Sequence, residues 1–343
     1  MMKSAKLSTE NVVVVCFFLF LFIYPLWGTR FAVDTFSGYI IVVLMTFSVA
    51  LIWNYCGIFS FGQAAFYGVG AYAYGIMNSA LGGGNMTLIA ALIGVLAGGL
   101  FALFIGFFIF YGGVSDFFVG IITFCITLAL QSFMNQTAGS QWKIAGVALG
   151  GQNGIVNISP LLIGSISFGE YRLMYYLVTF VVLVIFLILR WIAKSNLGYA
   201  MYGIRENKER SSMFGYNTAR IQTFVFGAGG VIAALAGVLF ASWNNYIEPS
   251  RFALSTSTLA IAMVIAGGKK SLAGAMLLTV IYSRFAQFLS AQGSAYSTII
   301  LGLFIILSIL LTPEGLMYSL FRVIDKLCSR VFCIRQKQGG VGK

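Results

Sequence analysis

Residues 195–216 read SNLGYAMYGIRENKERSSMFGY and form the only long charged interruption in an otherwise apolar chain. Within six positions the stretch carries five charged side chains, which are Arg205, Glu206, Lys208, Glu209 and Arg210. A surface that meets another protein on the cytoplasmic side would use such charges. A solvated connector between two helices would equally tolerate them. Charge alone therefore does not distinguish a protein-contact surface from a solvated connector.

The composition is that of an integral membrane protein. Hydrophobic residues make up 59% of the 343 residues, charged residues make up 9%, and the mean hydropathy is +0.93. Soluble proteins carry about 25% charged residues. The net charge of +12 comes from basic residues in loops and in the C-terminal tail. We therefore interpret the positive charge as a signal of membrane topology and expect no nucleic-acid partner.

Several kinds of chemistry are excluded by the residues that the chain lacks. Without histidine there can be no serine–histidine or cysteine–histidine catalysis and no histidine metal ligand. Cys328 and Cys333 in the tail are too few for a structural zinc site. A phosphate-binding loop ending at residues 268–271 would need Gly and Ser or Thr where Met263 and Lys270 stand. We expect no catalytic residue, no metal and no bound cofactor.

Apolar stretches of about 20 residues, long enough to cross a ~30 Å hydrocarbon layer, predict the membrane spans. They lie near residues 11–28, 37–55, 60–79, 86–111, 115–134, 171–192, 221–243, 254–268, 272–290 and 295–312. The fold class is therefore all-α, a polytopic transmembrane helix bundle of about ten spans. The number falls to eight if the weaker segments 60–79 and 254–268 are broken or re-entrant.

The distribution of basic residues predicts the orientation. With the N-terminus inside, the inner segments hold sixteen Lys and Arg residues and the outer segments hold four. Because Lys and Arg collect in cytoplasmic loops, we place both termini in the cytoplasm. The chain then divides into a cytoplasmic N-terminus (1–10), a permease domain (11–312) that includes the cytoplasmic segment 193–220, and a basic cytoplasmic tail (313–343).

The first apolar run also admits a second interpretation. Residues 12–27 follow Lys3 and Lys6, as the hydrophobic part of a signal peptide would. The next residues, Gly28-Thr29-Arg30, lack a small-x-small cleavage site. We therefore expect a retained first span.

The stretch Ser60 to Gly75, SFGQAAFYGVGAYAYG, has more glycine than a plain helix interior tolerates. Close helix packing through small residues would explain the glycines. A broken helix whose free backbone groups line a substrate cavity would explain them as well. A second unusual position is Arg284, which lies in the middle of a predicted span, where an ionised side chain is expensive unless it is paired or wet.

Three segments together resemble a known family, the permease subunits of ATP-binding-cassette importers for branched-chain amino acids, with the similar urea and short-chain amide permeases. They are SFGQAAFYGVGAY (60–72), the S-x-x-G-x-A-x-x-x-I-R-E-N pattern from Ser195 to Asn207 followed by Gly215, and AGGKKSLAG (266–274) after Pro249 and Phe252. Gln63, where the family usually has His, and the pair Lys269-Lys270 depart from the family pattern.

The resemblance implies three sets of functional residues. A coupling segment that seats in the ATPase would include Gly198, Ile204, Arg205, Glu206, Asn207, Lys208, Arg210 and Gly215. A translocation path would be lined by Ser60, Phe61, Gln63, Phe66, Gly68, Gly70, Tyr72, Gly267 and Gly268. Outer loops 135–170 and 244–255 would contact a binding protein through Trp142, Lys143, Glu248 and Arg251.

The resemblance also implies the partners and the location. The chain would sit in the bacterial inner membrane with a second permease, two cytoplasmic ATPases and a periplasmic solute-binding protein, and ATP would be used by the ATPases alone. Leucine, isoleucine and valine are the expected cargo, and urea or a short-chain amide is the alternative. A secondary transporter driven by an ion gradient and a passive channel for small solutes are the rival classes of protein.

Overall fold

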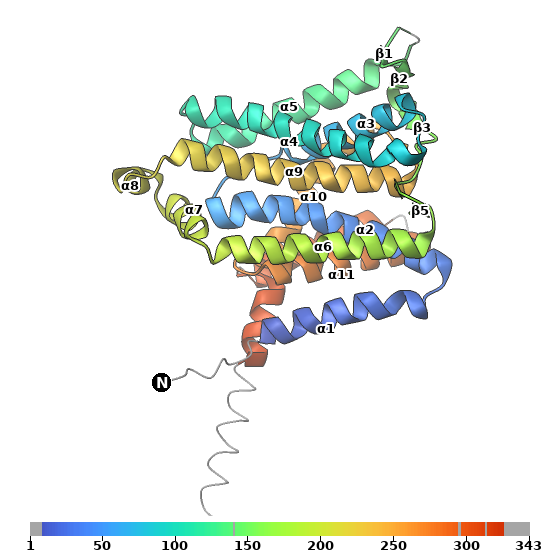
Figure 1. The fold of residues 1–343 in the computed structure, drawn as a ribbon. Helices are drawn as coiled ribbons and strands as arrows, with labels where there is room; N and C mark the ends of the chain where they lie inside the picture. Colours follow the sequence, from blue (N-terminus) through green and yellow to red (C-terminus); the bar gives the residue numbers. More distant parts are fainter. Residues whose placement is uncertain (1–8, 140, 294–295, 313, 326–343) are drawn as a thin grey trace, which may run out of the picture. The chain divides into compact units, whose positions relative to one another are not determined.

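The computed structural model describes residues 9–139, 141–293, 296–312 and 314–325, and most of these are helical (Figure 1). The α-helices are α1 (Thr9–Ile23), α2 (Arg30–Ala50), α3 (Gln63–Ala80), α4 (Thr87–Tyr111), α5 (Asp116–Gln136), α6 (Tyr171–Ala193), α7 (Asn196–Glu206), α8 (Lys208–Met213), α9 (Thr218–Asn244), α10 (Leu254–Gly267), α11 (Leu272–Ala291) and α12 (Ser297–Leu311). The N-terminal eight residues and the tail beyond residue 325, with Cys328 and Cys333, lie outside the described residues.

The strands are short and lie outside the long helices. They are β1 (Lys143–Ile144), β2 (Val147–Ala148), β3 (Ile155–Val156), β4 (Leu162–Ile163), β5 (Ile166–Ser167) and β6 (Tyr246–Ile247). Each is two residues long, and all pair antiparallel, β1 with β2, β3 with β6 and β4 with β5. The all-α fold class predicted from the apolar stretches is confirmed for the described residues.

The number of spans is smaller than the sequence predicts. Seven described helices are long and apolar enough to cross a membrane, at 9–26, 30–55, 84–111, 116–136, 171–193, 218–244 and 272–291. An eighth is possible if Ser297–Leu311 and Leu316–Asp325, bent by 48° to each other, form one broken span. The ten-span prediction is therefore too high, whereas the eight-span alternative agrees with the upper of these two counts.

Relative to eight spans, the two extra segments are those that the sequence marks as weak, 60–79 and 254–268. Helix α3 contains enough Gly, Tyr, Gln and Asn to fall below the hydropathy of a spanning helix. Helix α10 has 14 residues. At 1.5 Å per residue it reaches only about 21 Å, less than the ~30 Å hydrocarbon layer.

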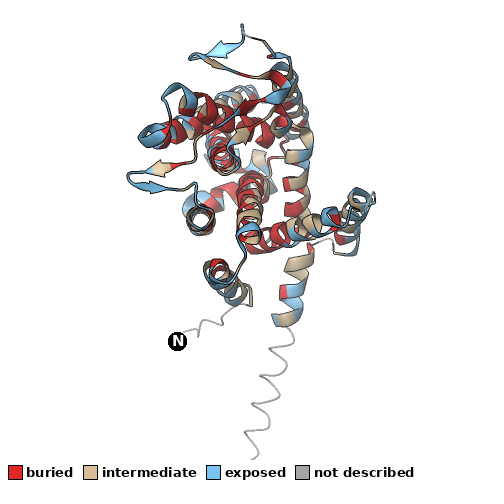
Figure 2. Ribbon diagram, turned by 90° about the vertical axis from the view of Figure 1, so that its right-hand side faces the viewer, coloured by how far each residue is buried: buried red, intermediate tan, exposed pale blue. Residues whose placement is uncertain are grey.

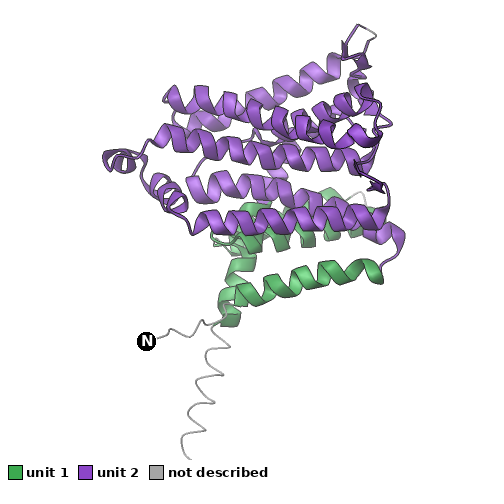
Figure 3. Cartoon of the chain, viewed as in Figure 1, with its two compact units in different colours: residues 1–27, 263–343 green, residues 28–262 purple. Residues whose placement is uncertain are grey.

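The chain forms two compact units, residues 28–262 and residues 1–27 with 263–343 (Figure 3). In the larger unit α3, α4 and α9 pack against one another most extensively. Small residues make this packing possible, because a side chain at Gly237 would collide with the carbonyl oxygen of Tyr67. Likewise, side chains at Gly230 and Gly98 would collide with Ala102 and Ala234.

Helix α2 packs between α6 and α9 in the same unit (Figure 1). Its start is held by Asp34, which accepts a hydrogen bond of 2.9 Å from the indole nitrogen of Trp243 on α9. Buried residues concentrate where the helices face each other (Figure 2). The outer side of α4 exposes large apolar side chains such as Leu96 and Leu100, as a lipid-facing helix requires.

Two groups of connections lie at opposite ends of the helices of the larger unit (Figure 1). Helices α7 and α8 lie at one end, and the strands β1 to β5 lie at the other. Residues Ile155 and Val156 of the long loop pair with Ile247 and Tyr246, so the loop after α5 is tied to the loop after α9. The charged stretch and the long loop therefore face opposite sides of the bundle.

The smaller unit contains α1, α11, α12 and the helix Leu316–Asp325. Ser271 begins α11 by accepting a hydrogen bond of 2.9 Å from the amide of Gly274. The Ser271 hydroxyl also donates to Glu10 at 3.1 Å. Lys270 and Arg322 both pair with Glu314, at 3.4 and 3.0 Å. Exposed pairs of this kind contribute at most ~1 kcal/mol each, so they position the chain ends more than they stabilise them.

We expect Gly237→Ala to destabilise the larger unit, because the added methyl group would press on the backbone of α3. Overpacking of this kind costs about 1–3 kcal/mol. The matched control is Gly302→Ala in α12, where the added carbon would have no described atom within 4 Å apart from the backbone of its own helix. Alanine there should stabilise the helix slightly, by up to about 1 kcal/mol. Thermal unfolding of the two purified variants in detergent measures the difference, and equal transition temperatures would contradict the packing argument.

Candidate functional site

The helical backbone is interrupted between α2 and α3. A π-helix (Leu51–Tyr55) ends α2, and residues 57–60 adopt no regular structure. The side chains of Ser60 and Gln63 are nevertheless buried. Isolated π-helical turns are frequent at functional sites. An irregular backbone at membrane depth is tolerated only where its polar groups find partners or face water.

Side chains from two other helices satisfy the interrupted backbone. The Phe61 amide donates to the Thr123 hydroxyl at 3.1 Å, and the Phe61 carbonyl accepts from Thr127 at 3.2 Å. Ser257 of α10 donates to the same carbonyl at 2.7 Å and accepts from the Ala64 amide at 2.8 Å. Hydroxyl side chains of α5 and α10 thus replace the missing helical hydrogen bonds.

Gln63 begins α3 and is fully buried. Its side-chain oxygen lies against the hydroxyl of Ser48, which is also 2.7 Å from the carbonyl of Gly229. The side-chain nitrogen of Gln63 has no hydrogen-bond partner among the described residues. A buried donor without a partner costs about 1–3 kcal/mol, so a water or a ligand that accepts from it would be stabilised there.

The remaining residues assigned to the path in this unit lie in different surroundings. Ser60 accepts from the Gly62 amide at 3.0 Å, so its oxygen shapes the local turn. Phe66 packs on Phe226 with ring centroids 5.4 Å apart, deep among the helices. Phe61 packs edge-on against Phe59 at 5.0 Å beside the interruption.

Tyr72 stacks on Phe252 at 5.5 Å, and no described residue is hydrogen-bonded to its hydroxyl. These two rings help to line an apolar groove of about 320 Å³ together with residues of α4, α5 and the long loop. The groove has the size of a small-molecule site. Among the described residues, Gln63 near the start of the SFGQAAFYGVGAY stretch and Tyr72 at its end thus each have a polar atom without a partner.

The glycines of the predicted path lie at close helix contacts. A side chain at Gly68 would meet the ring of Phe252, and one at Gly70 would meet the backbone of Ala234 at 2.7 Å. Gly267 and Gly268 belong to the smaller unit, where Gly267 lies against the backbone of Ala275. Packing therefore accounts for these glycines, and their place along a path stays a prediction.

The charged stretch folds as two short helices with side-chain caps. Ser195 accepts from the Gly198 amide at 3.3 Å to begin α7, and Asn207 accepts from the Arg210 amide at 2.7 Å to begin α8. Gly198 has to be glycine, because a side chain there would collide with the carbonyl of Ile192. Gly215 has a φ of +86°, which favours glycine at the turn before α9.

Arg205 joins α7 to the interrupted helix. Its guanidinium donates to the backbone carbonyl of Asn54, and its Cγ would lie 3.1 Å from a Cβ at Gly57. On the same helix Tyr202 packs edge-on against Tyr55 at 5.6 Å, and Ile204 is buried. From the sequence, Arg205 is one of several predicted surface charges. In the structure its guanidinium has a partner inside the protein, the carbonyl of Asn54.

The outer surface of α7 and α8 has a shallow pocket of about 250 Å³. It is lined by Tyr199, Ala200, Gly203, Glu206, Asn207, Arg210, Ser211, Phe214 and Tyr216. Large apolar side chains beside it are strongly exposed, at 68% for Tyr199, 76% for Phe214 and 85% for Met213. Aromatic residues and methionine surrounded by charges are typical of a surface that another protein covers.

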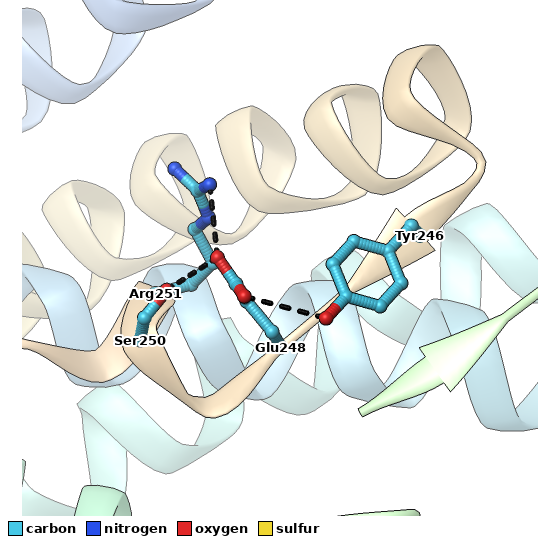
Figure 4. Close-up of polar contacts among 4 residues, drawn as sticks. All are labelled: Tyr246, Glu248, Ser250 and Arg251. Atoms are coloured by element: carbon cyan, nitrogen blue, oxygen red, sulfur yellow. Dashed lines mark hydrogen bonds and ion pairs between the residues drawn. The ribbon is translucent and has the colours of Figure 1, made fainter. Parts of the chain in front are cut away.

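Glu248 is the centre of a polar cluster in the loop after α9 (Figure 4). Its carboxylate accepts from Ser250 at 2.6 Å, from Arg251 at 3.2 Å and from Tyr246 at 3.3 Å. The Ser250 hydrogen bond and the Arg251 charge lower the pKa of Glu248 below its ordinary value. Arg251 also lies over the ring of Phe240, 4.4 Å from its centroid. This pair is held locally and is only partly available to a partner.

The other two predicted contacts of a binding protein lie in the long loop. Trp142 packs edge-on against Phe133 at 5.6 Å and exposes 39% of its surface. Lys143 is exposed at the start of β1.

Asn54, Thr123 and Ser257 could not be identified from the sequence, since serine, threonine and asparagine within apolar stretches carry no motif of their own.

A protein family described as "Branched-chain amino acid transport system / permease component" matches residues 31–309. The chain is 24% identical to the high-affinity branched-chain amino acid transport system permease protein LivM of Salmonella typhimurium over 319 residues, which cover 86% of this chain and 72% of that protein. The protein of the same name from Escherichia coli strain K12 is 25% identical with the same coverage.

A second permease of this kind is similar over a shorter stretch. The high-affinity branched-chain amino acid transport system permease protein LivH of Salmonella typhimurium is 27% identical over 196 residues, which cover 56% of this chain and 61% of that protein. No match was found among solved structures.

We expect Ser257→Ala to destabilise the protein by about 1–3 kcal/mol, because the buried Ala64 amide would lose the Ser257 hydroxyl as its hydrogen-bond acceptor. Thr258→Ala is the matched control on the next position of α10. Its hydroxyl is exposed and bonds only to the carbonyl of Leu254 within the same helix. Thermal unfolding in detergent compares the two variants. A Ser257→Ala protein as stable as Thr258→Ala would show that the interruption does not depend on this hydroxyl.

Proposed function

The chain belongs to the branched-chain amino acid transport permease family, and from this membership we propose that it translocates leucine, isoleucine and valine. It is a multi-pass membrane protein and the permease component of a transport system. ATP hydrolysis is then the task of separate subunits. The observation that carries the proposal is the interrupted helix, whose buried polar atoms at Gln63 and Tyr72 lack partners within the described part of the chain.

The proposed complex contains a second homologous permease, two cytoplasmic ATPases and a periplasmic solute-binding protein in the bacterial inner membrane. The chain's own similarity to both LivM and LivH supports a paired permease. Basic residues support the orientation, because Arg205, Lys208 and Arg210 lie at the end of the larger unit where α7 and α8 are found (Figure 1). We place this end and both termini in the cytoplasm.

We propose that α7 and α8 form the coupling segment, with the aromatic pocket around Tyr199 and Phe214 as the surface that the ATPase covers. Arg205 provides a direct connection from this surface inward. It holds the carbonyl of Asn54, and the interruption at Ser60 follows six residues later in the chain. A displacement of α7 would therefore pull on the end of α2 and on the turn that leads to Gln63, as an alternating-access cycle requires.

An ion-coupled secondary transporter is a weaker interpretation. Such proteins use acidic side chains within the membrane to bind the coupling ion. The acidic residues within the candidate spans are Glu10, Asp34 and Asp116, and each lies in the first or second turn of its helix and not at the middle of the span. A passive channel would have no use for the exposed aromatic surface on α7 and α8. Family membership and this surface both favour the ATP-driven importer.

The substrate is tested by uptake of labelled leucine and labelled urea in the parent cell and in a cell that lacks this gene. We expect leucine uptake to be lost and urea uptake to persist. Loss of urea uptake alone would assign the chain to the urea and amide permeases with the same mechanism. Depleting ATP while the ion gradient is maintained should stop uptake, and continued uptake would favour a secondary transporter.

The coupling path is tested by Arg205→Ala, which removes the contact with Asn54 but leaves the outer pocket intact. We expect leucine uptake to fall about tenfold or more, since a lost hydrogen bond to a charged group costs about 1.5–3 kcal/mol. The ATPase should still co-purify with the permease. Glu206→Lys, at the pocket, should instead weaken co-purification. Lys194→Ala, an exposed residue before α7, is the control, and normal uptake by Arg205→Ala would contradict the proposed path.

A further inference from the structure

Arg284 lies near the middle of α11, one of the helices that are long and apolar enough to span the membrane. It follows the first residue of the helix, Leu272, by twelve positions. At 1.5 Å per residue this places its Cα about 18 Å into a hydrocarbon layer of ~30 Å. The side chain is exposed at this depth. An ionised arginine facing lipid tails at this depth is unfavourable, so this position has to meet water or another polar group.

The packing of α11 shows which side of the helix carries Arg284. Tyr282 and Phe285 face α12, because their rings lie 6.3 and 5.8 Å from that of Phe304. Arg284 shares a stripe with Ile281 and Phe288, three residues before it and four after it. These neighbours expose 47% and 52% of their surface. The stripe therefore presents one cation between two large apolar side chains.

No acidic residue of this chain is available at the depth of Arg284. The nine Asp and Glu residues are Glu10, Asp34, Asp116, Glu170, Glu206, Glu209, Glu248, Glu314 and Asp325. Each lies within the first two turns of a helix, in α7 and α8, in a loop between helices, or at the end of the last described helix. An anion that pairs with Arg284 in mid-membrane must therefore come from outside the chain.

We propose that Arg284 faces water within the membrane and binds the carboxylate of the transported amino acid as it crosses. The inference rests on the proposed function and adds a substrate-binding residue to it. A guanidinium binds a carboxylate through two parallel hydrogen bonds, and Ile281 and Phe288 offer an apolar surface to a branched side chain. Urea has no carboxylate, so a requirement for Arg284 also separates the two substrate classes. Water around the guanidinium keeps the binding weak enough for release.

Aqueous access is tested first, in the assembled importer, with the native cysteines replaced by serine. Arg284→Cys should react with a cationic, membrane-impermeant methanethiosulfonate reagent, because such reagents modify only thiolates in water. Phe285→Cys, which faces α12, is the matched control and should not react. An unreactive Arg284→Cys would place the residue against lipid or an acidic residue of a partner subunit and would overturn the inference.

The carboxylate role is tested by uptake of labelled leucine into proteoliposomes that contain the assembled importer, with ATP hydrolysis measured in parallel. Arg284→Gln should lower uptake about tenfold or more, since the charge-assisted contact is lost. ATP hydrolysis and co-purification of the ATPase should stay within about twofold, which excludes misfolding. Arg284→Lys keeps the cation and should retain more uptake than Arg284→Gln. Arg172→Gln, at the second residue of α6, should leave uptake unchanged.

The outcomes distinguish a failure of the proposed function from a failure of the role given to Arg284. A wild-type importer that carries urea but not leucine would overturn the proposed function and the carboxylate role with it. A wild type that carries leucine, with an Arg284→Gln variant that carries it equally well, would overturn this inference alone. Equal loss of leucine uptake and of ATPase association in Arg284→Gln would assign Arg284 to subunit assembly, which also overturns it.

Discussion

The structure of the larger unit depends on one constraint, that a polar backbone inside a membrane protein needs hydrogen-bond partners. Between α2 and α3 the chain leaves the helical conformation, and the carbonyl of Phe61 loses its partner within a helix. Thr127 and Ser257 supply that partner from α5 and α10. The relative position of these helices is therefore fixed by a few hydroxyl groups. The short α10, which cannot span the membrane alone, has a defined role in this arrangement.

Close helix packing provides the rigid framework around the interruption. Glycine and alanine on α3, α4 and α9 bring the three backbones so near that Gly70, Gly94 and Gly237 leave no room for a side chain. Packed interfaces of this kind resist continuous deformation and move as bodies. Motion during transport is then expected at the irregular segment 57–62, where hydrogen bonds come from single side chains. The rigid helices thus keep the bundle together, and the polar interruption between α2 and α3 is the place where it can move.

Much of this could be predicted from the sequence. Apolar stretches, the glycine-rich run from Ser60 and the charged run around Arg205 indicate the helical fold, the interruption and the coupling segment, because each has a local signature. The span number could be predicted only as a range of eight to ten, because hydropathy does not tell whether the short segment 254–268 crosses the membrane or is re-entrant. The role of Ser257 could not be predicted at all, because its partner Phe61 lies 196 positions away in the sequence. Contacts between distant segments leave no trace in a single sequence.

Arg205 and Arg284 also have different surroundings that a single sequence does not reveal, because the partner of a charged side chain depends on contacts between distant segments. Arg205 lies in a polar run, yet its guanidinium is used inside the protein, on the carbonyl of Asn54. Arg284 lies in an apolar helix, yet its side chain is exposed. A charged side chain in a membrane protein needs a polar partner or water. Within the described part of the chain, Arg205 has such a partner and Arg284 has none. The partner of the second has to be sought outside the chain, and the proposed cargo carries a suitable anion.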